Sequence, residues 1–290
     1  MKSGFVSFVG RPNVGKSTLT NAIVGEKVAI TSSKPQTTRK AIRAIHTTEQ
    51  GQLVIVDTPG LHRPRTLLGQ RLNDLVEHTL SEVDLIAFCS PANEPIGVGD
   101  KKIISDIAEL RAKKVAIVTK SDTVSREKLA QHLMSINEVY NWDEIIPVSA
   151  LTGEQVEHLV GVLIAKLPEG PMYYPEDIQT EETDEDRICE LVREAALELV
   201  RDEMPHSLAV SLDEIVEGEQ KPTMHVSLWV ERDSQKGIVI GKGGSMLKTI
   251  GTKARIEIEA LLGHPVHLAI QVRIAKDWQR DAKQLGKLGF

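Results

Sequence analysis

The segment GRPNVGKS at residues 10–17 constrains this chain more than any other part of it. An apolar run at 5–9 that reads as a strand precedes it, and residues 18–24, which read as a helix, follow it. This is the setting of a phosphate-binding loop, whose glycines let backbone N–H groups turn toward phosphate oxygens at a helix N-terminus. The loop lysine neutralises the terminal phosphates, and the hydroxyl after it holds Mg²⁺. The segment predicts a nucleotide site with contacts from Asn13, Val14, Gly15, Lys16, Ser17 and Thr18.

Four short apolar runs follow the loop, at residues 53–56, 85–88, 115–118 and 145–148. Each run is nearly continuous, as is typical of strands that are covered on both faces. Helical patterns lie between the runs, so we expect an α/β domain of the P-loop NTPase class with a doubly wound, mostly parallel sheet. Residues 41–47 alternate in polarity, and a short turn joins them to the next run, which predicts an antiparallel edge strand.

Two further motifs lie near the carboxyl ends of strands, where ligands of open sheets bind. Asp57-Thr58-Pro59-Gly60 ends the run at 53–56, so its carboxylate can reach Mg²⁺ through a water and its last N–H can sense a γ-phosphate. Thr37 and Thr38 lie in a polar stretch that is long for a simple connection. A threonine there places its hydroxyl on Mg²⁺ only while the γ-phosphate is present, and we favour Thr38 over Thr37. The predicted metal ligands are Ser17, Thr38 and Asp57, and the residues predicted to carry hydrolysis are Lys16, Thr38, Asp57 and Gly60.

The identity of the base is expected from Thr119-Lys120-Ser121-Asp122, directly after the run at 115–118. An aspartate here accepts hydrogen bonds from N1–H and the exocyclic amine of guanine, and adenine offers no such donors. The aliphatic stem of Lys120 can lie on the purine, and the backbone of residues 149–151 can present N–H groups to the guanine O6. The pattern predicts GTP and GDP as ligands, through Thr119, Lys120, Asp122, Ser149, Ala150 and Leu151.

In order and spacing, these five motifs resemble the G motifs of the translation-factor-related GTPases. Thr119 departs from the family pattern, because it stands where the family carries an asparagine that ties this loop to the phosphate loop. We therefore expect guanine selectivity to rest mainly on Asp122, with reduced affinity. Leu61, followed by His62, stands where Ras-like switches carry a glutamine, so another group has to orient the attacking water.

Asn13 leaves two interpretations open. GTPases with an asparagine at this loop position resemble enzymes activated by K⁺, in which the cation replaces an arginine finger. The alternative is that the side chain only stabilises the loop by hydrogen bonds. Either way, we expect slow intrinsic turnover, nearer about 10⁻³ s⁻¹ than a metabolic rate.

A second domain follows the first. The breaker Pro168-Glu169-Gly170-Pro171 ends the last helix of the first domain, and the residues after it are polar and acidic, as in a linker. We therefore divide the chain into a G domain at 1–170, a linker at 171–185 and a second domain at 186–290.

The second domain reads as helix, strand, strand, helix, glycine loop, helix and strand. Its loop, with the sequence IGKGG at 240–244, carries the G-x-x-G signature of KH domains, and the order resembles the type II arrangement, an α+β fold, here with a C-terminal helix. A loop without side-chain bulk lets an RNA backbone approach a helix N-terminus, and the apolar groove beside it admits unstacked bases.

Local charge supports an RNA-binding interpretation although the chain has a net charge of −6. Residues 176–233 hold 5 Lys and Arg against 18 Asp and Glu, whereas residues 234–290 hold 10 against 4. The basic part of the chain thus contains the glycine loop. We predict binding of single-stranded RNA, and no DNA partner, through Ile240, Gly241, Lys242, Gly243, Gly244 and Lys248.

A P-loop GTPase domain joined to one KH domain resembles the Era family over essentially the whole chain. The resemblance implies a GTP-switched protein that engages the 3′ end of 16S rRNA and assists maturation of the small ribosomal subunit. It also implies peripheral association with the inner face of the cell membrane, for which the sequence shows no anchor. Two alternatives stay open: an RNA-binding module that senses GTP with little hydrolysis, and a GTPase coupled to cell-cycle or stress signalling.

Cysteine usage and hydropathy predict a cytoplasmic location. Cys89 and Cys189 are far apart and match no metal spacing, which favours a reducing compartment. No leader pattern and no apolar run long enough for a membrane span is evident in the sequence.

Overall fold

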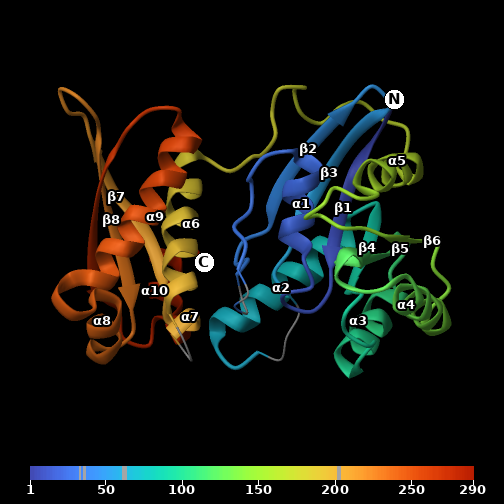
Figure 1. Cartoon of the computed structure of the whole chain (residues 1–290), viewed down its shortest axis with the longest axis horizontal. Helices are drawn as coiled ribbons and strands as arrows, with labels where there is room; N and C mark the ends of the chain where they lie inside the picture. The colour runs from blue at the N-terminus through green and yellow to red at the C-terminus, as the bar shows by residue number, and fades with distance from the viewer. Residues whose placement is uncertain (33, 35–36, 61–63, 201–203) are drawn as a thin grey trace. The chain divides into compact units, whose positions relative to one another are not determined.

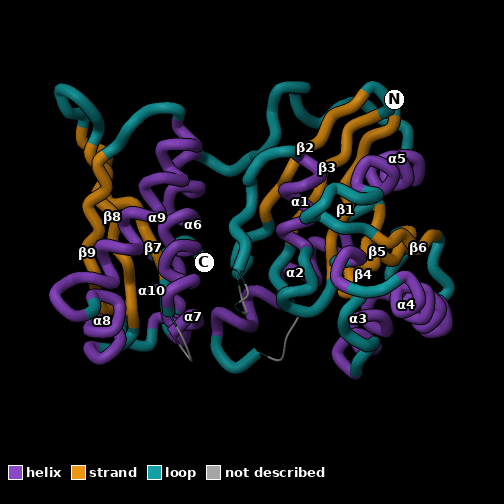
Figure 2. Tube along the Cα trace, in the orientation of Figure 1, coloured by secondary structure: helices purple, strands orange, loops and turns teal. Residues whose placement is uncertain are grey.

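The chain forms two compact units in a computed structural model that describes residues 1–32, 34, 37–60, 64–200 and 204–290. The first unit comprises Met1–Ala29, Thr38–Arg63 and Leu72–Glu181. The second comprises Ile30–Thr37, Pro64–Arg71 and Glu182–Phe290. Figure 1 and Figure 2 together label the helices and strands of both units, and Figure 2 colours them by type.

The described strands of the first unit form a six-stranded sheet in the order β2-β3-β1-β4-β5-β6. All neighbours pair in parallel except β2 and β3, which are antiparallel, so the predicted edge strand is confirmed. The strands are β1 (Lys2–Val9), β2 (Ile42–Thr48), β3 (Gly51–Asp57), β4 (Leu85–Pro91), β5 (Lys113–Thr119) and β6 (Glu144–Pro147). The carboxyl ends of the parallel strands therefore meet at one edge of the sheet.

Helices cover both faces of this sheet, which explains why its strands read as continuous apolar runs. One core joins α1 and α5 to side chains such as Phe8 and Ile55, and the other joins α2, α3 and α4 to side chains such as Phe88 and Val118. The helices are α1 (Lys16–Val24), α2 (Leu67–Glu82), α3 (Val98–Ala108), α4 (Arg126–Val139) and α5 (Val156–Lys166). The predicted doubly wound fold is confirmed.

The second unit contains the three-stranded sheet β7-β8-β9, in which β7 is antiparallel and β9 parallel to β8. Alternate residues of β8, from Met224 to Val230, face a core shared with α6, α8 and α9. The elements are α6 (Asp184–Leu199), α7 (Met204–Ser207), β7 (Ala209–Val216), β8 (Thr223–Val230), α8 (Asp233–Ile240), α9 (Ser245–Leu262), β9 (His267–Ile274) and α10 (Ala282–Lys287). This order confirms the predicted α+β fold of the type II KH arrangement; the short α7 was not predicted.

The segment predicted as a linker packs against the edge of the first sheet. The side chain of Gln52 is fully buried, and its Oε1 accepts hydrogen bonds from the main-chain N–H groups of Tyr173 and Tyr174 at 2.8 and 3.0 Å. Farther along, the N–H of Ile45 donates to the carbonyl of Gln179 at 2.8 Å. The last boundary between the two units along the chain accordingly falls between Glu181 and Glu182. Helix α6 begins just after it, capped by the Thr183 side chain.

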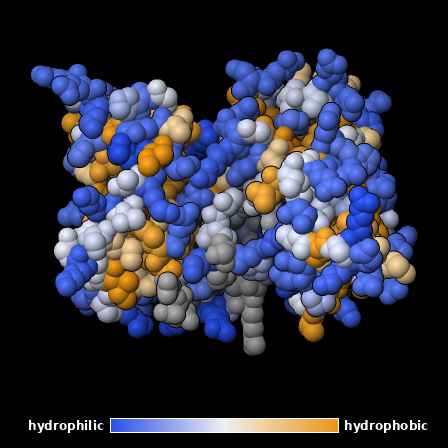
Figure 3. Space-filling model, viewed as in Figure 1, coloured by the Kyte–Doolittle hydropathy of each residue, from blue (hydrophilic) through white to orange (hydrophobic). Residues whose placement is uncertain are grey.

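Hydrophilic side chains dominate the face of the molecule shown in Figure 3. Within the part of the chain that the structure describes, no helix combines the length and apolar character needed to cross a membrane.

Candidate nucleotide and RNA sites

The phosphate-binding loop connects β1 to α1 through left-handed backbone. Asn13 has φ 65° and Gly15 has φ 99°, and α1 begins at Lys16 immediately afterwards. No side chain caps this helix, and no acidic residue lies in its first turn. The first N–H groups of α1 therefore have no side-chain competitor for an anion.

Two opposite charges are buried beside the loop. The Lys16 ammonium donates to the carbonyls of Gly10 and Arg11, both at 3.3 Å, and only 7% of the residue is exposed. Burial lowers the pKa of Lys16, an effect that Asp57 opposes. Burial likewise raises the pKa of the fully buried Asp57, opposed by Lys16 and by hydrogen bonds from Ser17 and Thr38. A phosphate and a cation are groups that could compensate these two charges.

Three side chains that carry oxygen atoms converge at the start of α1. Ser17 Oγ donates to Asp57 Oδ2 at 2.6 Å and lies 3.1 Å from Thr38 Oγ1. The other carboxylate oxygen, Asp57 Oδ1, is buried and makes no hydrogen bond to any described residue. A hard cation prefers oxygen donors of this kind, so the residues fit Mg²⁺. Thr37 is not part of the group, because its hydroxyl donates to the carbonyl of Lys34 at 2.7 Å.

Gly60 lies close to the phosphate-binding loop. A Cβ added to Gly60 would be 3.0 Å from the backbone nitrogen of Pro12, so only glycine fits without a shift. This places the Gly60 backbone where a group bound by the loop could reach it. Leu61 and His62, which follow it, lie outside the described residues.

The loop after β5 is tied directly to the phosphate-binding loop. Thr119 Oγ1 donates to the carbonyl of Val14 at 2.6 Å, and the Lys120 ammonium donates to the carbonyl of Asn13 at 2.9 Å. The hydroxyl of Thr119 thus makes the link between loops that the family makes with asparagine. Asp122 lies in the following 3₁₀ turn (Ser121–Thr123) with its side chain exposed.

The segment at 149–151 offers fewer donors than the sequence predicts. The N–H of Ser149 donates to the carbonyl of Glu154 at 3.1 Å, and its hydroxyl accepts from the N–H of Thr152. Among the described residues, the N–H groups of Ala150 and Leu151 make no such bond. These two N–H groups, and not that of Ser149, are therefore available to a base.

The three glycines of the G-x-x-G loop of the second unit have positive φ angles, 72° at Gly241, 61° at Gly243 and 80° at Gly244. A Cβ at Gly241 would lie 2.8 Å from the backbone nitrogen of Met246, whereas nothing lies within 4 Å of a Cβ at Gly243. Helix α9 then begins without a side-chain cap or an acidic residue in its first turn. Its N-terminal N–H groups can therefore donate hydrogen bonds to a phosphate.

A groove of about 420 Å³ lies between α9 and β9. Apolar side chains form its floor, and basic residues lie along it, so it suits bases and phosphates together. Two of the residues predicted to bind RNA, Gly244 and Lys248, line this groove. The other predicted residues are not among its lining residues: Ile240, Gly241, Lys242 and Gly243. His267 was not predicted, since its only sequence signal is its place at the start of β9. The lining residues are Gly244, Leu247, Lys248, Gly251, Thr252, Arg255, His267, Leu268 and Ile270.

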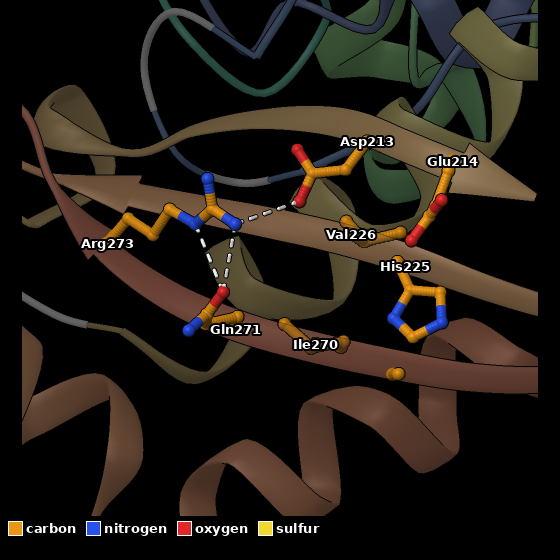
Figure 4. A pocket seen from close by; sticks show the side chains of 8 residues that line it. Asp213, Glu214, His225, Val226, Ile270, Gln271 and Arg273 are labelled. Carbon is orange, nitrogen blue, oxygen red and sulfur yellow. Dashed lines mark hydrogen bonds and ion pairs between the residues drawn. The ribbon is translucent and has the colours of Figure 1, made fainter.

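A second cavity, of about 300 Å³, lies over the three strands β7, β8 and β9 (Figure 4). Asp213 accepts from Ser227 Oγ at 2.6 Å and lies 3.5 Å from the Arg273 guanidinium. Arg273 also donates twice to Gln271 Oε1, at 3.1 and 2.9 Å. These polar groups thus pair with one another across the strands, and we assign no ligand to this cavity.

Replacing Thr119 tests the tie between the two nucleotide loops. Thr119→Ala leaves the buried carbonyl of Val14 without its donor, at a cost of about 1–3 kcal/mol. We expect GDP and GTP affinity to fall together by roughly 5- to 150-fold. Equilibrium titration with a fluorescent nucleotide measures this. Ser135→Ala, which removes an exposed hydroxyl bond on α4, serves as the control, and unchanged GDP affinity in Thr119→Ala would contradict the role of the tie.

Replacing Asp57 tests the buried charge. Because burial raises the pKa of Asp57, the nucleotide-free fold loses stability as the pH rises through that pKa and the carboxyl ionises. Asp57→Asn should therefore melt at a higher temperature than the wild type at neutral pH, and the difference should vanish in acid. Its nucleotide binding should no longer respond to Mg²⁺. A lower melting temperature at neutral pH, or an intact Mg²⁺ response, would refute this role of the carboxylate.

Comparisons with known proteins agree with this geometry. A family model described as a 50S ribosome-binding GTPase matches residues 5–121, and a KH domain model matches residues 203–279. GTPase Era of Mycolicibacterium smegmatis is 58% identical over 295 residues, covering 100% of this chain and 99% of that protein. GTPase Era of Nocardioides sp. is 56% identical over 301 residues, covering 100% and 96%.

Solved structures of Era share the fold of the whole chain. The crystal structure of Era in complex with MgGDPNP and nucleotides 1506–1542 of 16S ribosomal RNA has a TM-score of 0.96 at 34% identity. A variant of Aquifex aeolicus Era bound to GDP and AlF₄⁻ has a TM-score of 0.95 at 34% identity. Each covers 100% of this chain, which covers 99% of each solved chain. The chain therefore belongs to the Era family of GTPases, which join a GTP-hydrolysing domain to a KH domain.

Proposed function

We propose that this GTPase binds Mg²⁺ and GTP at the loop before α1 and single-stranded RNA at the groove beside α9. The observation that supports it most strongly is the convergence of the Ser17, Thr38 and Asp57 oxygens beside uncapped N–H groups. The RNA that we propose is the 3′ end of 16S rRNA, because the related Era structure contains nucleotides 1506–1542 of that molecule. The cellular role that follows is assistance in maturation of the small ribosomal subunit.

Hydrolysis at this site depends on positioning and on neutralising the charge of the β- and γ-phosphates. The Lys16 ammonium makes two long hydrogen bonds to carbonyls. Exchanging these weak bonds for a phosphate would cost little. The N–H groups of the loop and of α1 add fixed donors. Mg²⁺, which Ser17, Thr38 and Asp57 would hold, neutralises further phosphate charge when bound. Gly60 would contribute its N–H beside the γ-phosphate.

Guanine is selected, in this proposal, by the exposed carboxylate of Asp122. The turn that carries Asp122 follows two residues that are bonded to the phosphate-binding loop, Thr119 and Lys120. The base site and the phosphate site therefore keep a fixed separation. The N–H groups of Ala150 and Leu151 would meet the guanine O6 from the other side. This arrangement favours GTP over ATP because adenine presents no donors to the carboxylate.

Asn13 is the residue through which K⁺ would act. It is held in left-handed backbone with φ 65°, and its carbonyl is bonded to Lys120. The exposed side chain on this backbone could coordinate a monovalent cation near the phosphates. That cation would supply the charge that an arginine finger supplies in other GTPases.

The groove between α9 and β9 is the proposed RNA site. Positive φ angles bring the glycine backbone to the surface, where a sugar-phosphate chain can approach the N-terminus of α9. Exposed Lys242 and Lys248 add positive charge at the loop and along the helix. The apolar floor, which includes Leu247 and Ile270, suits unstacked bases. Peripheral membrane association, which the family resemblance implies, stays a prediction that no described residue bears on.

Lys16→Ala tests the hydrolysis. We expect release of phosphate from GTP to fall by about 10²- to 10³-fold, the usual loss when one donor to a transition state is removed. The assay contains Mg²⁺ and either K⁺ or Na⁺, and Lys101→Ala on α3 serves as a matched surface control. Turnover that does not depend on Lys16 would contradict the proposed site. Equal rates in K⁺ and Na⁺ would contradict only the role of Asn13.

Lys242→Asp combined with Gly243→Asp tests the RNA groove. Space is open around Gly243, so the fold should survive while two negative charges face the RNA backbone. Binding of a single-stranded fragment of the 16S rRNA 3′ end should weaken, and the salt dependence of log K should decrease by about 0.7 for each phosphate that the protein no longer neutralises. Lys283→Asp on α10 is the control for a lysine-to-aspartate reversal away from the loop. Unchanged affinity in the double variant would place the RNA elsewhere.

A further inference from the structure

The arginine of the phosphate-binding loop is bound to a helix that carries none of the predicted nucleotide contacts. Arg11 Nε donates to Asp100 Oδ1 at 2.9 Å, and Arg11 Nη2 donates to Glu94 Oε2 at 3.0 Å. Asp100 lies in the first turn of α3, and Glu94 lies in the segment that leads to that helix. All three residues belong to the first compact unit, so the contact is internal to the G domain.

Asp100 does more than cap its own helix. Its Oδ2 accepts a hydrogen bond from the main-chain N–H of Gly97 at 2.8 Å, as an acidic residue at a helix N-terminus commonly does. That bond uses one carboxylate oxygen, and the other accepts from Arg11. Asp100 is fully buried, and a buried carboxylate is stable only with charged or hydrogen-bonding partners. Its burial therefore depends on the arginine of the loop.

The stem of Arg11 packs directly on the backbone of α3. A Cβ added to Gly99 would lie 3.1 Å from Arg11 Cδ, so a side chain at position 99 would push the arginine aside. The side chain of Glu94, the other partner, is 46% exposed, and an ion pair so open to water contributes little. Asp100, and not Glu94, therefore fixes the position of the arginine.

The main chain at this point of the loop contacts two groups of the nucleotide site. The carbonyl of Arg11 accepts a hydrogen bond from the Lys16 ammonium at 3.3 Å. The next residue, Pro12, lies against Gly60, since a Cβ added there would be 3.0 Å from the Pro12 nitrogen. Lys16 and Gly60 are the groups that the proposed function places beside the γ-phosphate. A shift of the Arg11 main chain would therefore move the surroundings of both.

We propose that Arg11 is a positioning residue for GTP hydrolysis. Asp100 holds its guanidinium against α3, and the main chain of Arg11 and Pro12 then keeps Lys16 and Gly60 in place for the transition state. The inference rests on the proposed function of those two residues, and it requires no contact between Arg11 and the nucleotide. Because a small misplacement lowers a rate far more than it lowers binding, the effect should appear in hydrolysis and hardly in GDP affinity.

Kinetics of the full chain with GTP and Mg²⁺ test this role. Arg11→Met keeps an unbranched stem that can pack on α3 and removes the guanidinium. We expect kcat to fall by about 10- to 100-fold, with KM and GDP affinity little changed. Arg11→Lys, which keeps a charge for Asp100, should recover part of the lost rate. Lys102→Met, which removes a cation from an exposed ion pair with Asp106 on the same helix, is the control and should match the wild type.

A double variant separates positioning from stability. Arg11→Met alone leaves the buried charge of Asp100 without its cation, so the melting temperature should fall. Adding Asp100→Asn removes that charge and keeps an oxygen for the N–H of Gly97, so the melting temperature should rise again. Since the arginine is still missing, kcat should stay low. Recovery of kcat together with the melting temperature would overturn the inference, because stability alone would then explain the loss.

Wild-type kcat in Arg11→Met, or an equal loss of kcat and GDP affinity, would also overturn the inference. Glu94→Gln should keep nearly the full rate, and a loss as large as that of Asp100→Asn would contradict the assignment of the holding contact to Asp100. The Lys16→Ala variant distinguishes the two levels of the proposal. Turnover that does not depend on Lys16 refutes the proposed function, whereas turnover that depends on Lys16 but not on Arg11 refutes only this inference.

Discussion

The burial of two opposite charges at the carboxyl end of the parallel sheet is the constraint on which the rest of this structure depends. Lys16 and Asp57 have both lost their water, and burial lowers the pKa of the one and raises that of the other. A fold selected for stability alone would place apolar groups here. Charges kept at such a cost indicate a ligand of complementary charge, and a metal-bound triphosphate meets both at once.

The parallel sheet and one hydrogen bond between loops bring the other polar groups of the site close to these charges. Parallel strands bring their carboxyl ends to one edge, so the loops after β1, β3 and β5 become neighbours although they are far apart in sequence. One threonine hydroxyl, that of Thr119, joins the phosphate loop to the base loop. In the second unit, α6 contributes its apolar face to the KH core, while its residues Arg193 and Glu194 bond to Thr37 and Thr31 of the segment 30–37.

Most of the fold could be predicted because its signals are local. Continuous apolar runs predicted a sheet covered on both faces. Each glycine loop could be recognised because strand and helix patterns flank it in the sequence. Proximity at strand ends likewise predicted which residues could meet, and the structure brings Ser17, Thr38 and Asp57 together. The sequence could not show that residues 30–37 pack with the KH unit, because Arg193 and Glu194 read as ordinary surface charges of an amphipathic helix. Nor could it show that the expected linker pairs with Gln52, or that Glu154 occupies the N–H of Ser149.

Ligand-induced stabilisation tests most directly whether the buried charges form a guanine nucleotide site. Thermal unfolding of the purified chain should be followed with GDP, GTP analogue or ATP analogue, each with Mg²⁺ and with a chelator. A ligand that binds only the folded state stabilises it by RT ln(1 + [L]/Kd) and so raises its melting temperature. We expect a clear rise with the guanine nucleotides, a larger rise for the GTP analogue when Mg²⁺ is present, and none with the adenine nucleotide. An equal rise with the ATP analogue, or no rise with any nucleotide, would contradict a guanine nucleotide site at these charges.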